Sequence, residues 1–161
     1  MGLSVPDLGA VAQVVGLDLT IRAYPAGDPI RDRAQLALLE RLRVQLHPML
    51  RWRTEVPLPI PGDLRAWDAE IHGSVPRGWR TRVEAETTIA DGQALERKLA
   101  LKLRDDPDGG IILLVADTHA NRRALATIGP SLRAVVPLDS RPLMRALRSG
   151  TEPPGSGIVV A

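Results

Sequence analysis

The sequence predicts an α/β domain in which a central mixed sheet is flanked by helices. From residue 31 onward the patterns follow the order helix, strand, strand, strand, helix, strand, helix, which is typical of a layered α/β protein and not of a bundle or a sandwich. Residues 111–116 form a continuous apolar run, as expected for a strand buried on both faces. The 161 residues, 44% of them hydrophobic, suffice for one domain with a substantial core.

Residues 1–28 are expected to form a helix–strand extension that precedes the main domain. Apolar residues recur at helical spacing over 4–15, with Ser4 as the candidate N-cap, and residues 17–23 alternate apolar and polar side chains as a strand does. The segment 24–29, with Pro25, Gly27 and Pro29, is the predicted boundary. The main domain is assigned to residues 29–149, and residues 150–161 to a Pro/Gly-rich tail with an edge strand at 158–160.

The main domain is predicted to begin with an amphipathic helix over residues 31–46. Its leucines form one stripe, and Gln35 falls on the same stripe, so the first turn is less apolar than the rest. His47-Pro48 ends the helix, and residues 50–56 follow as a strand. The stripe consists of Leu38, Leu39, Leu42 and Leu46.

Residues 65–71 and 80–86 are predicted to form a β-hairpin with an apolar and a charged face, joined by the turn residues 73–78. Directly opposed residues of an antiparallel pair point the same way. A register that keeps the apolar residues together therefore sets Asp68 opposite Glu84 and Glu70 opposite Arg82. The predicted apolar face holds Trp67, Ala69, Ile71, Val83 and Ala85, and the charged face holds Asp68, Glu70, Arg82, Glu84 and Glu86.

The second half of the domain is predicted to be mainly helical around the buried strand. Asp91 is the expected N-cap of a helix over 92–104, whose core stripe is Leu95, Leu99 and Leu103. Residues 105–110 form a turn before the strand. Further helices are predicted at 120–128, capped by residues 117–119, and at 140–148, with a short strand at 134–136 between them.

The composition excludes several classes of function. Without cysteine the chain has no disulfide, no thiolate nucleophile and no Cys-ligated zinc. Phe is absent, and three Trp and one Tyr are too few for a base-stacking platform. No apolar run approaches the ~20 residues of a membrane span, and the chain starts without a basic leader. We therefore expect a cytoplasmic protein with no membrane partner.

The basic residues are almost all arginine, since Lys98 and Lys102 are the two lysines among 21 Lys+Arg. The planar fork of arginine suits phosphate groups. A GC-rich coding bias, which raises Arg, Ala, Gly and Pro together, explains the same composition. A net charge of +2 makes no strong electrostatic footprint by itself, so both explanations stay open.

The acidic side of the predicted hairpin is the main candidate for chemistry. Mg²⁺ or Mn²⁺ prefers hard oxygen ligands, usually one or two carboxylates with waters and substrate phosphate, and Asp68 and Glu84 are the expected ligands. Such a metal polarises a phosphodiester and lowers the pKa of an attacking water. Glu86 is a further ligand or a general base. The alternative is a solvated polar strand face with a Glu70–Arg82 pair.

Basic residues around this face are the candidate nucleic-acid contacts. Lys98 and Lys102 lie four residues apart and so share one face of the predicted helix, and Arg82 and Lys98 are placed to offset phosphate charge. A solvated helix face explains such residues equally well. The assigned contacts are Arg82, Arg97, Lys98 and Lys102.

The element order, with Asp68 on the second strand and Glu84-Ala85-Glu86 on the third, resembles the PD-(D/E)xK nuclease superfamily, whose domains have the restriction-endonuclease-like fold. The resemblance covers roughly residues 31–136. It implies a Mg²⁺- or Mn²⁺-dependent endonuclease acting on DNA, with Asp68, Glu84 and Glu86 as catalytic residues. Glu86 stands where lysine is usual in this superfamily. The resemblance also places its first-helix acid at Glu40, its second-helix polar residues at Gln93, Arg97 and Lys98, and a weaker alternative to Asp68 at Asp63.

Residues 5–22 resemble the last helix of an Xre-type helix-turn-helix domain and the strand that follows it. This second resemblance implies a DNA-binding transcriptional regulator whose nuclease-like domain is catalytically inactive and serves homodimerisation or sensing. An ordinary amphipathic helix–strand unit has the same pattern. The sequence thus leaves two functions: a metal-dependent endonuclease, or an inactive nuclease-like domain of an Xre-family regulator.

Overall fold

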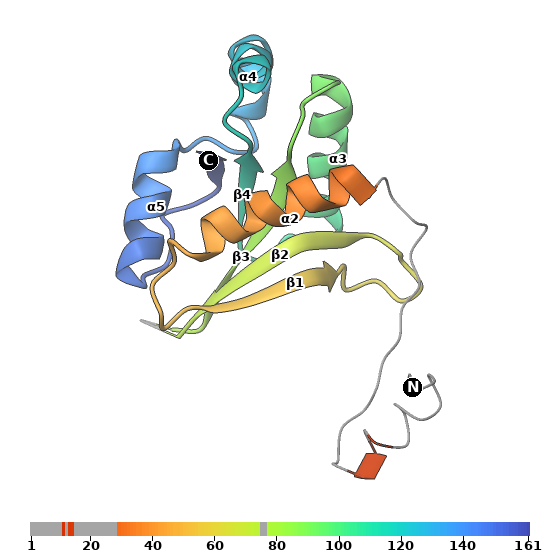
Figure 1. Cartoon of the computed structure of the whole chain (residues 1–161), viewed down its shortest axis with the longest axis vertical. Coiled ribbons are helices and arrows are strands. Elements are labelled where there is room, and N and C mark those ends of the chain that lie inside the picture. Colours follow the sequence, from red (N-terminus) through yellow and green to blue (C-terminus); the bar gives the residue numbers. More distant parts are fainter. Residues whose placement is uncertain (1–10, 12, 15–28, 75–76) are drawn as a thin grey trace.

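The computed structural model describes residues 11, 13, 14, 29–74 and 77–161 of the chain. Over these residues the protein is a mixed α/β structure in which a five-stranded mixed sheet is flanked by helices (Figure 1). The predicted fold class is confirmed at this level. Val11, Gln13 and Val14 are helical; the rest of the predicted helix over 4–15 and the predicted strand over 17–23 lie outside the described residues.

The elements follow the predicted order. In sequence they are α2 (Pro29–Arg43), β1 (Arg51–Pro57), β2 (Ala66–Gly73), β3 (Trp79–Glu86), α3 (Gly92–Asp105), β4 (Gly110–Val115), α4 (His119–Leu132), α5 (Ser140–Ser149) and β5 (Gly157–Val160). Helix α4 continues past its predicted end and includes Gly129 and Pro130. Two predicted caps are confirmed: Asp91 accepts a hydrogen bond from Ala94 N, and Thr118 accepts one from Asn121 N.

The strands lie in the order β1-β2-β3-β4-β5. The pairs β1–β2 and β2–β3 are antiparallel, whereas β3–β4 and β4–β5 are parallel. The parallel pairs are connected by α3 and by α4 with α5, as parallel strands require. The predicted Glu70–Arg82 pair of the β2–β3 hairpin is confirmed, whereas Asp68 and Glu84 are not paired in the ladder, which ends at Ala69–Val83.

The sheet separates two apolar layers. Helices α2 and α5 pack on one face through residues such as Leu38, Leu42 and Leu147, and α2 crosses this face in Figure 1. Helices α3 and α4 pack on the other face through Leu95, Leu99 and Leu132. Strand β4 contributes alternate side chains to both layers, which confirms that it is buried on both faces. None of the described helices is long and apolar enough to cross a membrane.

The C-terminal strand β5 forms the predicted edge of the sheet, and its outer side is covered by Ser140. The Ser140 hydroxyl accepts a hydrogen bond from Val160 N and donates one to Ile158 O. The predicted strand at 134–136 is wrong. Its backbone amides continue the end of α4, since those of residues 134–136 donate to Ser131 O or Leu132 O. A single bridge between Leu138 and Gly157 remains.

The predicted apolar face of the hairpin is wrong at one residue, Trp67. Ala69 packs in the layer under α2, whereas Trp67 packs in the layer under α3, so strict alternation fails between them. The cause lies on the neighbouring strand. Glu55 has a left-handed backbone with φ of 50°, and the β1–β2 ladder skips the Glu55–Asp68 pair. At this point the alternation of side chains between the two faces of the sheet is shifted by one residue on both strands, and Asp68 lies at the shift.

Candidate functional site

Asp68 lies where β2 and β3 separate. The ladder between the two strands ends at the Ala69–Val83 pair. Beyond it the Asp68 carboxylate takes the place of a backbone acceptor, because its Oδ2 accepts a hydrogen bond of 2.7 Å from Ala85 N. The side chain therefore lies against β3, next to the residue before Ala85, which is Glu84.

The environment of Asp68 disfavours its charge. Burial is the largest cause that raises the pKa of Asp68, and repulsion by the Glu84 carboxylate is the second. The hydrogen bond from Ala85 N and the charges of Lys102 and Lys98 lower it, and the net pKa is about 6. A carboxyl group with such a pKa exchanges its proton near neutral pH. Perturbation of this kind, by burial together with a specific charged neighbour, is typical of functional sites.

Glu84 is completely buried and is held by two lysines from α3. Its Oε1 lies 2.5 Å from Lys98 Nζ, and its Oε2 lies 2.6 Å from Lys102 Nζ. Both carboxylate oxygens of Glu84 therefore contact an ammonium group.

Glu86 completes the carboxylates at the open end of the cluster. Lys98 Nζ donates a hydrogen bond of 2.9 Å to Glu86 Oε1, and 44% of the Lys98 side chain is exposed. Burial opposes the charged form of Lys98, but the Glu84 and Glu86 carboxylates outweigh it and raise its pKa above the ordinary value. Lys98 is thus a cation at the boundary between the buried carboxylates and solvent.

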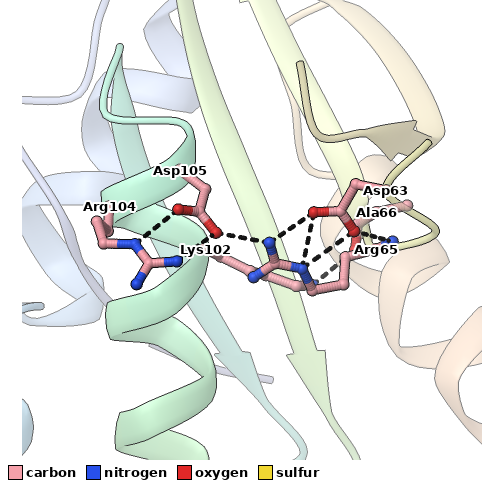
Figure 2. Close-up of polar contacts among 6 residues, drawn as sticks. All are labelled: Asp63, Arg65, Ala66, Lys102, Arg104 and Asp105. Carbon is pink, nitrogen blue, oxygen red and sulfur yellow. Dashed lines mark hydrogen bonds and ion pairs between the residues drawn. The ribbon is translucent and has the colours of Figure 1, made fainter. Parts of the chain in front are cut away.

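Helix α3 presents its two lysines to β3 because they lie one helical turn apart. Its end is fixed to the start of β2, where Lys102 Nζ donates to Ala66 O and Arg65 bridges Asp63 and Asp105 (Figure 2). Asp63, the weaker alternative to Asp68, is therefore held by Arg65, whose guanidinium lowers the pKa of that carboxyl. Together these side chains form a carboxylate–lysine cluster, which consists of Asp68, Glu84, Glu86, Lys98 and Lys102.

A second buried network lies beside this cluster and involves Arg82. Its guanidinium contacts Asp106 through Nε and Nη2 at 2.8 and 2.7 Å, and its Nη1 lies 2.9 Å from Glu70 Oε2. Trp67 Nε1 also donates to Asp106. The predicted Glu70–Arg82 pair is therefore present, but it is buried and not on a solvated face.

The four assigned nucleic-acid contacts differ in their access to solvent. Arg82 and Lys102 are buried and bound to internal carboxylates, so neither reaches a phosphate without breaking an ion pair. Nucleic-acid contact by these two residues, expected from the sequence, stays a prediction that would require the ion pairs to open. Arg97 and Lys98 are exposed on α3, and for them nucleic-acid contact stays a prediction.

The first-helix residue that approaches the site is not Glu40. Glu40 is exposed and paired with Arg43 on its own helix. Instead, Gln35 lines a pocket of about 270 Å³ together with Glu55 and Asp68, between α2 and the sheet. The signal for Gln35 was present in the sequence, because it is the polar residue on the leucine stripe of α2. Nothing in the strand pattern indicated Glu55.

The cluster offers the type of ligand that a hard divalent cation prefers, but few such ligands. Asp68 and Glu84 offer carboxylate oxygens, and both oxygens of Glu84 already contact a lysine ammonium. Among the described residues no three His, Asp or Glu side chains are arranged to hold a metal ion. A metal here would have two carboxylate ligands completed by water and substrate oxygens, which is usual for Mg²⁺.

Comparison with known proteins gives no match: no protein-family model, no curated protein and no solved structure matches the chain. A function has to be inferred from its residues and their geometry.

Proposed function

We propose that the chain is a nuclease-like domain with a restriction-endonuclease-like core that hydrolyses phosphodiester bonds in DNA. The observation that carries this proposal is the position of Asp68, which lies where β2 and β3 separate and adjoins Glu84 on the next strand. Carboxylates on two neighbouring strands at such a point suit the binding of a metal and a phosphate together. The element order α2-β1-β2-β3-α3-β4 is consistent with this core.

Lys98 supports the proposal by supplying the positive charge that position 86 lacks. Glu86 occupies the place where the superfamily usually has lysine, yet its carboxylate contacts the Lys98 ammonium at 2.9 Å. An ammonium thus reaches the carboxylates from α3 and not from β3. At this position it is placed to stabilise the negative charge that develops on a phosphodiester during hydrolysis.

Each cluster residue has a proposed task. Asp68 and Glu84 would hold Mg²⁺ or Mn²⁺, which when bound supplies polarisation of the phosphodiester and a more acidic water. Glu86 is next to solvent and is placed to accept a proton from the attacking water. Lys98, whose side chain is half exposed, would exchange its contact with Glu84 Oε1 for one with a phosphate oxygen. Lys102 remains with Glu84 and keeps that carboxylate oriented.

A second candidate function is an inactive nuclease-like domain of a DNA-binding regulator. The observation that favours it is the complete burial of Glu84, both of whose oxygens already contact a lysine. Such a self-neutralised cluster is stable without a metal. The two candidates differ in whether the cluster accepts a divalent cation.

The test is nicking of supercoiled plasmid by the wild-type chain with Mg²⁺ or Mn²⁺, compared with Asp68→Asn and Glu86→Gln. Each variant keeps the shape of the side chain and removes its charge. Asp108→Asn is the matched control, because Asp108 is an exposed acid outside the cluster. We expect nicking by wild type and by the control, and a loss of at least tenfold in the two cluster variants.

Equal nicking by wild type and Asp68→Asn would show that the activity does not come from the cluster and belongs to a contaminant. No nicking by folded wild type with either metal would favour the inactive domain.

A further inference from the structure

A row of basic side chains lies at the end of the hairpin away from the carboxylate–lysine cluster. Arg51 is paired with His72, and His72 with Arg80, so the three stand side by side across β1, β2 and β3. Directly opposed residues share a face of the sheet, so the row gathers two guanidinium groups beside one imidazole.

Internal carboxylates compensate only part of this row. His72 Nε2 is 2.5 Å from Glu70 Oε1. Arg80 Nη2 is 3.5 Å from both Asp106 Oδ1 and Asp108 Oδ2, longer than a strong charge-assisted hydrogen bond. Among the described residues, no carboxylate forms an ion pair with Arg51.

Arg53 adds another exposed cation beside Arg51. The two side chains are two residues apart on β1 and so point to the same side. Arg53 Nη1 is 3.9 Å from Glu70 Oε1, and 65% of its side chain is exposed. Glu70 is already bound to His72 and Arg82. The exposed side of β1 therefore presents two guanidinium groups without a close internal partner.

These groups border a pocket of about 820 Å³. It is lined by Met49, Arg51, Trp52, Arg53, His72, Gly73, Ser74 and Gly78. Its volume is within the usual range of ligand sites, and three basic side chains are among its lining. Trp52 stands between the two arginines on β1, and its ring points to the opposite face, where it packs against the apolar layer under α2.

We infer that this pocket binds a phosphate group through Arg51, Arg53 and His72. Arginine binds phosphate oxygens in pairs, and a row of two guanidiniums and an imidazole offers donors from two neighbouring strands. The phosphate belongs either to a nucleic-acid backbone or to a small phosphorylated molecule. The same chemistry recognises both.

His72 of the pocket lies on β2, the strand that also carries Asp68, and is paired with Arg80 on β3. Along one face of β3 the residues run Arg80, Arg82, Glu84 and Glu86, so Arg80 is about 13 Å from Glu84 at the rise of a strand. A nucleic acid bound at the pocket would extend from a basic to an acidic end of the hairpin. Only this nucleic-acid form of the inference rests on the proposed function; binding of a phosphate group does not.

The test is binding without divalent cations, in EDTA, so that cleavage plays no part. A fluorescein-labelled single-stranded oligonucleotide is followed by anisotropy across a salt series, and pyrophosphate is titrated by calorimetry. The variants are R51A/R53A and R51K/R53K, with Arg123→Ala as the control because it removes an exposed arginine on α4. Thermal unfolding checks that each variant is folded.

We expect R51A/R53A to weaken binding at least tenfold and to reduce the slope of log affinity against log salt by about 1 to 2. Arg123→Ala should match wild type, and R51K/R53K should recover only part of the affinity because it lacks the paired donors. Oligonucleotide binding with these effects identifies a backbone phosphate, and pyrophosphate binding alone identifies a small ligand.

Two results would overturn the inference: wild type that binds neither probe, or R51A/R53A that binds as Arg123→Ala does. Binding in EDTA that depends on Arg51 and Arg53, together with no nicking by folded wild type, would contradict the proposed function and leave the pocket intact. Nicking by wild type without such binding would contradict the pocket alone.

Discussion

Lys102 Nζ and Glu84 Oε2 are 2.6 Å apart in an ion pair that is buried in the layer between α3 and the sheet. The lysine also donates to Ala66 O and lies 5.0 Å from the centre of the Trp67 ring. One side chain thereby joins α3 to both β2 and β3. Removing one member of a buried pair costs more than removing both, because the other charge stays buried without its partner.

Lys102→Met is expected to lower the free energy of unfolding by about 3–5 kcal/mol, since Glu84 then keeps only the half-exposed Lys98. The double variant Lys102→Met/Glu84→Leu should lose clearly less than the two single variants together. Urea unfolding of the four proteins measures both quantities. A Lys102→Met protein within about 0.5 kcal/mol of wild type would show that the pair is not buried as described.

Asp68 is expected to destabilise the fold above pH 6. Its folded pKa of about 6 exceeds the ordinary 3.8, so between these values the folded chain binds more protons than the unfolded one. The contribution of Asp68 to the free energy of unfolding is therefore greatest below about pH 4, falls as pH rises to about 6, and stays lower above it. Asp68→Asn should be more stable than wild type at pH 8, by up to about 3 kcal/mol, and equal to it near pH 4.

Thermal unfolding of wild type and Asp68→Asn over pH 4–8 measures this difference. A constant difference across that range would contradict the raised pKa. A gain in stability together with a loss of nicking would mark Asp68 as a residue kept for function at a cost to the fold.

Asp106 is expected to be the most sensitive residue of the Arg82 network. Its carboxylate accepts from Arg82 and from Trp67 Nε1, so it ties the end of α3 to β2 and β3. Asp106→Ala leaves the buried Arg82 guanidinium without this partner and should lower the free energy of unfolding by about 3–5 kcal/mol. Asp108→Ala, two residues away and exposed, is the matched control and should stay near wild type. Equal effects of the two substitutions in urea unfolding would contradict the network.

Ser140 is expected to protect the outer edge of the sheet. Ser140→Ala removes the acceptor of Val160 N and the donor to Ile158 O, at a cost of about 1–2 kcal/mol. Hydrogen exchange should become faster at the Val160 amide. Ser149→Ala serves for comparison, because its hydroxyl bonds backbone carbonyls of its own helix and contacts Thr151. Unchanged exchange at Val160 would show that water replaces the hydroxyl fully.

The hairpin register was predictable because alternation along two strands leaves few pairings that keep apolar residues together. Glu70 opposite Arg82 follows from that constraint alone. The position of Trp67 was not predictable, since it depends on the left-handed backbone of Glu55, a residue type that does not favour that conformation. A pattern of residue types does not encode such a change of face.

The burial of charged residues was equally hidden from the sequence. Arg82 falls on the charged face of the predicted hairpin. Lys102 has the spacing of a core residue relative to Leu95 and Leu99, but a lysine is ordinarily expected at the surface. The packing of α3 on the hairpin encloses both side chains. The strand expected at 134–136 failed for a related reason. Its residues are apolar and Val136 is buried, but their amides are used by the end of α4. Apolar character predicts burial more reliably than it predicts strand pairing.

The most direct test of the proposed function is calorimetric titration of Mn²⁺ at pH 7.5 into wild type, Asp68→Asn and Asp108→Asn. We predict saturable binding to wild type and to Asp108→Asn, with at least a tenfold weaker affinity for Asp68→Asn. Equal affinity in all three proteins, or no binding to folded wild type, would contradict a metal site at the carboxylate–lysine cluster.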